Sequence, residues 1–271
     1  MSLFLGVVHA DDLTVHLYPS PYRLNWDTPQ TLAQTVVLSA LVPNVYPEGH
    51  EIGHASIELT CNSAGETPVH EQTGMTDTGA VSDSSLLLKQ EIGMGVLFYD
   101  YPGRLQTEQE IQKDIGAREL TGDVTWIHFQ ISPSTCQRLE TYLTEYRARG
   151  YYQNYGLNLR PRYGEGSGCS AFAASFMELA GVLNGELNSS WYKQLAVPLD
   201  LIGSPSTQKV SIESVIMGKS SSSWDAYGAP ANIARSIYFW DPDTFFYWAQ
   251  SQQENYPVEQ IGLAKGIRID A

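Results

Sequence analysis

Apolar and polar residues alternate strictly in several stretches of the chain, and each stretch predicts a strand. From Ala55 to Cys61 every second residue is apolar or small, and the residues between are polar. Residues 62–66 (NSAGE) are typical of a turn, so 67–74 (TPVHEQTG) are expected to return as the second arm of a hairpin. The same alternation predicts a strand over 124–131.

Helical spacing of apolar residues predicts helices around these strands. The predicted helices cover residues 28–42, 105–120, 133–150, 167–181 and a segment that begins at Asp241-Pro242. Ser134 and Gln137 can form a capping box at the start of the third.

Other stretches carry weaker patterns. Residues 11–30 are rich in Pro, Tyr and Asp and predict an irregular lead-in. Residues 76–95 predict a long loop with one short strand. Near the end we expect a short strand at 209–217 (KVSIESVIM) and a closing strand in GLAKGIRI.

The segment 163–181 (YGEGSGCSAFAASFMELAG) joins a glycine-rich approach to a single cysteine and an amphipathic helix. Ser167 is predicted to be the N-cap, which places Cys169 in the first turn. The positive end of the helix dipole lowers the pKa of a thiol there. Cys169 is therefore a candidate nucleophile, although a cysteine on a helix is also a common core residue.

Composition limits the classes of function. The 271 residues, 42% of them hydrophobic, suffice for one large domain, alone or with a smaller annex. A formal net charge of −14 argues against nucleic acid and anionic membrane surfaces as partners, because both attract basic patches. No apolar run of about 18 residues occurs, so we expect no integral membrane segment. No sequence signal indicates an oligomeric state.

The first ten residues (MSLFLGVVHA) are apolar and end in a small-x-small pattern that fits signal-peptide cleavage. We interpret residues 1–10 as the remnant of a signal peptide or tag, the alternative being a simple N-terminal strand. The prediction is export to the periplasm or the extracellular space. In such an oxidising compartment, three cysteines favour one disulfide, with Cys61 and Cys136 as the candidate pair and Cys169 left free.

His50, Glu51 and His54 form the pattern H-E-x-x-H, which holds zinc when it lies on a helix. Glu71 is a possible third ligand. The surrounding Gly49, Gly53 and Pro47 and the strand that follows argue against a helix. The zinc-peptidase reading is therefore kept as an alternative.

The second interpretation of this region assigns His54 as the general base for Cys169, because an imidazole converts a thiol to the reactive thiolate. A third polar group must orient the ring and is expected on the adjacent strand, at His70, Glu71 or Gln72. The alternatives are a solvated strand histidine and an ordinary polar hairpin arm.

GHASIEL, PVHEQTG and GCSAFAASFMELAG, in this order, resemble the circularly permuted papain-like fold over about residues 48–182. That group includes permuted NlpC-type cell-wall hydrolases and lecithin–retinol acyltransferase-like proteins. In it the histidine strand precedes the cysteine helix. Many relatives have Asp or Asn directly before the cysteine, where this chain has Gly168.

The resemblance implies roles for individual residues. Cys169 would be the nucleophile, His54 the base and Glu71 the orienting residue, with His70 in reserve. The backbone N–H of Cys169 would form part of an oxyanion hole. Tyr163 and Ser170 are expected beside the substrate or the oxyanion.

The sequence thus predicts an α+β, permuted papain-like fold in which an antiparallel sheet packs against the cysteine helix. Residues 11–194 would form the catalytic domain and 195–271 a C-terminal annex packed on it. The predicted function is a thiol hydrolase that needs no cofactor and cleaves an amide or peptide bond, in peptidoglycan or a peptide. The alternatives are a zinc metallopeptidase, an acyltransferase or lipid-acting member of the same fold, and a non-catalytic binding module.

Overall fold

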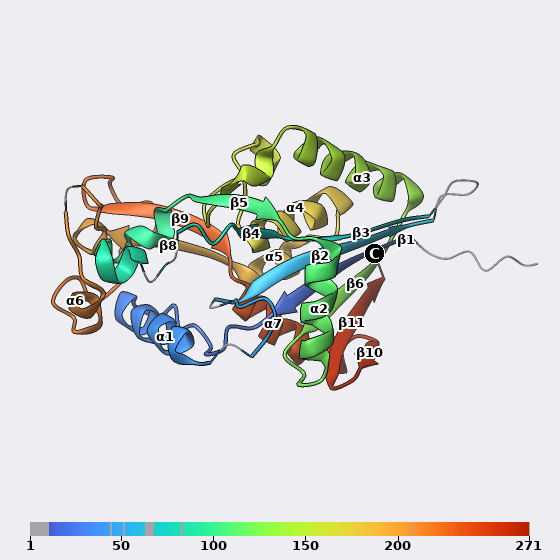
Figure 1. Cartoon of the computed structure of the whole chain (residues 1–271), viewed down its shortest axis with the longest axis horizontal. Coiled ribbons are helices and arrows are strands. Elements are labelled where there is room, and N and C mark those ends of the chain that lie inside the picture. Colours follow the sequence, from blue (N-terminus) through green and yellow to red (C-terminus); the bar gives the residue numbers. More distant parts are fainter. Residues whose placement is uncertain are drawn as a thin grey trace, which may run out of the picture.

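A six-stranded sheet lies at the centre of the computed structural model (Figure 1). Its order is β10-β11-β6-β1-β2-β3, and all neighbours are antiparallel except β11 and β6. The strands are β1 (Asp11–Tyr18), β2 (His54–Cys61), β3 (Val69–Thr73), β6 (Thr125–Ile131), β10 (Val258–Ile261) and β11 (Ala264–Asp270). The structure describes residues 11–43, 45–50, 52–62, 68–81, 83, 85–206 and 208–270. The chain is therefore α+β, as predicted, with a mixed main sheet, and the interpretation of residues 1–10 falls outside the described part.

The predicted irregular lead-in is wrong, because its first eight residues form β1 in the middle of the sheet, between β2 and β6. Leu13, Val15 and Leu17 alternate with Asp12, Thr14 and His16 and are fully buried. This period-two pattern is present in the sequence, but the prolines and tyrosines that follow it hide it.

One face of the sheet packs against helices α3 (Pro133–Ala148), α4 (Cys169–Ala180), α5 (Gly185–Trp191) and α7 (Pro242–Ser251). Ile57, Leu59 and Phe129 point into this core with the apolar residues of β1. Phe172 and Phe176 of α4 complete it, with ring centroids 5.0 Å apart. Burial of this apolar face supplies the main driving force for the fold.

All five predicted helices are confirmed: α1 (Pro29–Leu41), α2 (Glu108–Glu119), α3, α4 and α7. Two details are wrong. Ser132, not Ser134, caps α3 by accepting a hydrogen bond from the backbone N–H of Thr135. The predicted strand at 209–217 is instead a short helix, α6 (Ile212–Ile216), because Ser211 caps it.

A second apolar cluster forms beside the main sheet. It includes Leu32 of α1, Leu97, Val215 of α6 and Phe239. The strand pair β8 (Tyr192–Pro198) and β9 (Ala234–Trp240) borders it, and Figure 1 shows these elements together at the left. A small sheet of β4 (Met75–Asp77), β5 (Tyr101–Leu105) and β7 (Asn154–Tyr155) lies between the two clusters. Short helical turns lie at Ser85–Lys89, Met94–Phe98, Tyr151–Gln153, Pro161–Tyr163, Leu199–Leu201 and Gln252–Glu254.

Residues after 195 contribute to both parts of the molecule. They supply β9 to the second cluster, whereas α7 packs on the core face of β1 and β6, and β11 extends the main sheet.

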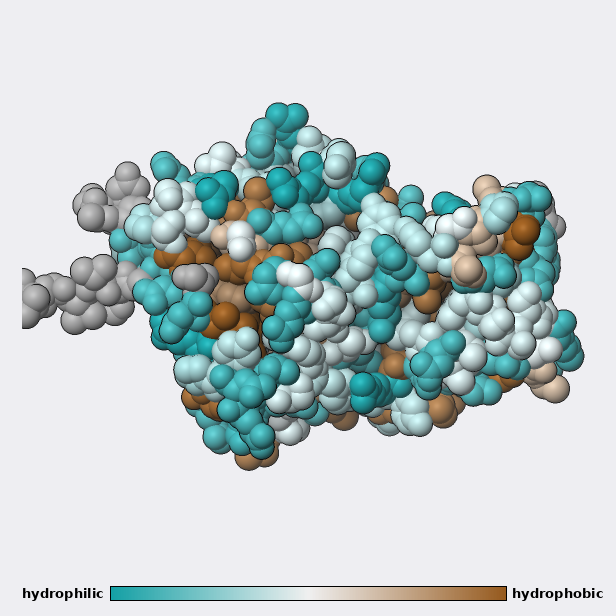
Figure 2. Space-filling view, turned by 180° about the vertical axis from the view of Figure 1, so that it is seen from behind, coloured by the Kyte–Doolittle hydropathy of each residue, from teal (hydrophilic) through white to brown (hydrophobic). Residues whose placement is uncertain are grey.

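None of the helices in the described ranges has the length and apolar character needed to cross a bilayer. The reverse face is mostly hydrophilic, with apolar side chains gathered in the half that holds the main sheet (Figure 2).

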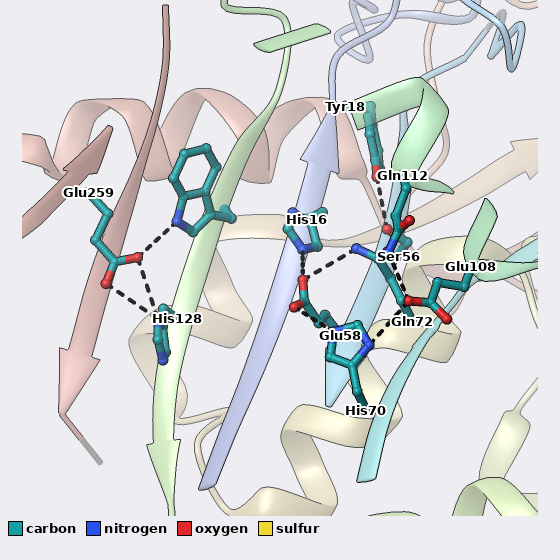
Figure 3. Close-up of polar contacts among 11 residues, drawn as sticks. His16, Tyr18, Ser56, Glu58, His70, Gln72, Glu108, Gln112, His128 and Glu259 are labelled. Carbon is teal, nitrogen blue, oxygen red and sulfur yellow. Dashed lines mark hydrogen bonds and ion pairs between the residues drawn. The ribbon is translucent and has the colours of Figure 1, made fainter. Parts of the chain in front are cut away.

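The other face of the sheet carries a network of histidines and carboxylates (Figure 3). Glu58 accepts hydrogen bonds from His16 at 2.9 Å and His70 at 3.0 Å. His70 also lies 3.3 Å from Glu108 of α2, which crosses in front of the strands. The hydrogen bond from His16 is the main factor that lowers the pKa of Glu58 to about 2, against the effect of its burial.

This network predicts a loss of stability in acid. The folded state holds the Glu58 pKa below its ordinary value of 4.5, so its stabilisation is complete above that value and disappears as the pH falls through about 2. Between pH 5 and 2 we expect Glu58→Gln to lose about 2 kcal/mol less free energy of unfolding than the parent. Denaturant unfolding at each pH measures this, with exposed Glu254→Gln as control. Equal pH dependence in parent and Glu58→Gln would contradict it.

The predicted disulfide between Cys61 and Cys136 is confirmed, and it ties the end of β2 to α3 with a Cα–Cα distance of 5.8 Å. It closes a loop with a sequence separation of 75 residues. Replacing both cysteines with serine is expected to lower the free energy of unfolding by about 4 kcal/mol, since the unfolded chain gains conformational freedom. Calorimetry of the parent and the double variant tests this, and unchanged melting would contradict it.

Candidate active site

The start of α4 holds Cys169 at the first helical position, where the helix dipole favours a thiolate. The N-cap is Gly168 and not the predicted Ser167, whose Oγ donates to the Gly168 carbonyl at 2.7 Å instead. A Cβ at position 168 would lie 3.0 Å from the carbonyl oxygen of Gly156. This close approach explains why glycine precedes the cysteine. Gly181 ends the helix with φ 77°, as predicted.

His54 is the first residue of β2 and is 2% exposed. Its Nε2 lies 2.7 Å from Oε1 of Gln106, a buried side chain that directly precedes the cap of α2. The backbone of Gln106 is fixed in turn, because its N–H donates to Gly74 and its carbonyl accepts from the hydroxyl of Thr73. Gln106 therefore fixes the orientation of the imidazole ring and leaves Nδ1 free to face the cysteine.

The predicted orienting residues, Glu71 and His70, are wrong. Strand register pairs Glu71 with Leu59, five positions beyond His54 along β2, which corresponds to about 17 Å. Glu71 binds Arg147 at 3.0 and 2.8 Å, and His70 belongs to the Glu58 network. Gln106 was missed because the sequence around it shows only a helix cap and gives no sign that its side chain reaches β2.

The surroundings of Cys169 favour its ionised form. Burial raises the pKa of the thiol, but the positive charge of His54 and a hydrogen bond from its ring lower it. Further hydrogen bonds come from the Ser170 hydroxyl, whose Oγ is 3.7 Å from Sγ, and from the backbone N–H of Ala55. The resulting pKa is about 7. The structure thus brings together Cys169, His54 and Ser170, three of the predicted site residues.

A tyrosine also contacts the sulfur, but it is Tyr155 of β7 and not the predicted Tyr163. Tyr163 is 75% exposed and lines a neighbouring hollow, not the cavity that holds Cys169. Burial first, and then the charge of Cys169 and a hydrogen bond to it, raise the pKa of the Tyr155 phenol well above its ordinary value. Tyr155 therefore keeps its proton and can donate a hydrogen bond beside the sulfur. Several tyrosines occupy this part of the sequence, and none of its patterns distinguishes Tyr155.

The predicted zinc alternative is not supported by the geometry of its histidines. Residues 50, 52 and 53 are not helical and His54 starts a strand, while Glu51 lies outside the described residues. The rings of His50 and His54 stack at 3.8 Å with planes 8° apart, so they do not converge on a common ion. Burial, with the charges of His54 and Arg118, lowers the pKa of His50 well below its ordinary value and keeps its ring neutral. In the described ranges, no three His, Cys, Asp or Glu side chains are placed to hold a metal.

A cavity of about 320 Å³ opens beside Cys169 and His54. Much of its wall is apolar and comes from the second cluster, including Leu32, Leu97 and Phe239. Among the described residues that line it, the carboxylic acids are Asp77, Asp83 and Asp241. Burial raises the pKa of Asp83 and raises the pKa of Asp241 to about 6, and Asp241 lies 3.7 Å from the ammonium group of Lys193. A substrate would therefore meet a poised thiolate, a hydrogen-bond donor and a largely apolar wall.

Comparisons with protein-family models, with curated proteins and with solved structures give no match.

We predict that His54 sets the reactivity of Cys169. His54→Ala removes the two largest effects that lower the thiol pKa and leaves burial opposed only by the hydrogen bonds from Ser170 and Ala55, so this pKa should rise. The rate of alkylation by iodoacetamide at pH 7 should then fall at least about tenfold, because each pKa unit changes the thiolate fraction by that factor. Gln106→Ala should give a smaller loss, and Gln72→Ala, on the Glu58 network, should give none. An unchanged pH profile in His54→Ala would contradict the pairing.

Proposed function

We propose that this protein is a thiol hydrolase in which Cys169 is the nucleophile, His54 the base and Gln106 the residue that orients His54. The observation that carries the proposal is geometric: the thiol at the start of α4 is hydrogen-bonded to the imidazole of His54, which Gln106 holds at 2.7 Å. This contact lowers the thiol pKa to about 7, although Cys169 is buried. A nucleophile, a base and an orienting group in hydrogen-bonded sequence are the requirements for covalent catalysis by cysteine.

Each proposed step of the reaction uses a side chain or backbone group that lies beside the Cys169 sulfur. The Cys169 thiolate attacks the carbonyl carbon, and the oxyanion accepts hydrogen bonds from the Tyr155 hydroxyl and the Cys169 backbone N–H. The protonated His54 gives its proton to the leaving amine, which departs as the acyl-enzyme forms. His54 then takes a proton from water as the water attacks the thioester. The C–S bond breaks, the acid product leaves, and Cys169 is restored as the thiolate beside protonated His54.

The permuted papain-like fold is part of this proposal. Two features support it: the histidine strand precedes the cysteine helix, and α4 packs directly on β2. The substrate we propose is an amide or peptide bond, in peptidoglycan or a peptide. The Cys61–Cys136 disulfide supports export to an oxidising compartment.

The apolar wall of the cavity favours a second candidate, an acyltransferase of the same fold. An apolar acyl group seated there would exclude water and allow an alcohol or amine to accept it. Partition of the acyl-enzyme between water and added glycerol or glycine ethyl ester separates the two functions.

We expect Cys169→Ala to abolish release of p-nitrophenol from p-nitrophenyl butyrate and release of amines from purified peptidoglycan. Cys169→Ser should retain less than about one hundredth of the activity, since serine lacks a comparable anion at neutral pH. Activity of the parent should rise as the pH increases through about 7, where Cys169 loses its proton. EDTA should leave the activity intact. Loss of activity with EDTA, together with retention in Cys169→Ala, would refute the proposal.

A further inference from the structure

A second hollow lies beside the catalytic cavity, over one face of α4. It has a volume of about 490 Å³, and we call it the α4 groove. Its lining includes Arg160, Arg162, Tyr163, Glu178, Tyr238 and Trp240. Ala171 and Ser175 form its floor one helical turn apart. Ala171 and Trp240 line both hollows, so the groove adjoins the cavity that holds Cys169.

The two hollows differ in charge. The described side chains that line the catalytic cavity include three aspartates and no Lys or Arg. The α4 groove instead contains Arg160 and Arg162 with one carboxylate, Glu178, in its lining. A bound molecule would therefore find cationic groups on this side of Cys169, in a protein whose net charge is −14.

Arg162 has hydrogen-bonding capacity to spare. In the described part of the chain its guanidinium makes one contact, from Nη1 to Glu178 at 3.4 Å, and its side chain is about half exposed. Arg160 is held more firmly by Glu165 and lies over the ring of Tyr163 at 4.5 Å. A guanidinium with unused donors binds a carboxylate through two parallel hydrogen bonds.

Aromatic side chains border the two arginines. Tyr163 and, from β9, Tyr238 and Trp240 line the same hollow as the arginines. The indole N–H of Trp240 is already bound to Asn188 at 2.9 Å, so this ring offers the groove apolar contact only. Such surfaces pack against the apolar part of a ligand whose charged end is bound by arginine.

We propose that the α4 groove is a subsite for the carboxylate-bearing end of the substrate, with Arg162 as its main ligand. The link to a substrate rests on the proposed function, whereas binding of a carboxylate in the groove does not depend on any reaction. The substrate would then carry a free carboxylate on one side of the scissile bond, and an apolar or amine-bearing part on the other, in the acidic cavity.

The test uses binding, so that it does not depend on catalysis. N-acetyl-L-phenylalanine is titrated into the full chain carrying Cys169→Ala, and its amide serves as the neutral twin. Chemical-shift changes measured by NMR are expected to show about tenfold tighter binding of the acid, because a charge-assisted contact is lost in the amide. In the parent, the acid should also slow alkylation of Cys169.

Arg162→Gln should abolish the preference for the acid, Arg162→Lys should keep part of it, and Glu178→Gln should strengthen it. Arg149→Gln, at the end of α3 and outside the groove, is the matched control. Equal binding of acid and amide, or a preference that survives Arg162→Gln, would overturn the subsite. If N-acetyl-L-phenylalanine binds as expected but Cys169 of the parent proves unreactive, the proposed function is refuted and the subsite stands.

Discussion

The contact between the buried side chains of Cys169 and His54 depends on their carrying opposite charges, as thiolate and imidazolium. Burial alone raises the pKa of a thiol and would leave it inert. Here the imidazolium, the hydrogen bonds from Ser170 and the Ala55 backbone, and the dipole of α4 more than offset that cost. Each contribution depends on the start of α4 lying against the start of β2, and the packing of this helix on the sheet fixes that junction.

The junction also explains which residue orients the base. The chain leaves β3 at Gly74, before it reaches the level of His54, so no β3 side chain can serve. Instead, the segment between β5 and α2 meets the end of β3 there and places Gln106 beside His54. The backbone N–H and carbonyl of Gln106 are both hydrogen-bonded to the end of β3. A neutral amide orients the ring without adding a charge, and it therefore leaves the positive charge of His54 available to Cys169.

Local patterns predicted much of this fold, because alternation, helical spacing and capping depend on near neighbours. They were sufficient for β2, β3, β6, five helices and the pairing of Cys61 with Cys136. They failed where distance along the chain matters. Strand register excludes Glu71, and the choice of Tyr155 over Tyr163 follows from the pairing of β7 with β5. The β8–β9 pair, separated by a long connection, has no local signal.

The distribution of charge around Cys169 adds a constraint on any substrate. A strongly acidic protein repels carboxylates at long range, so binding one requires a local cationic group. Arg160 and Arg162, each with a side chain about half exposed, line the α4 groove, whereas the cavity beside Cys169 contributes carboxylic acids and apolar walls. A ligand that reversed its orientation would place its carboxylate against Asp77 and Asp83 and its apolar part among guanidinium groups. In the proposed arrangement, this difference in charge favours one direction of binding across Cys169.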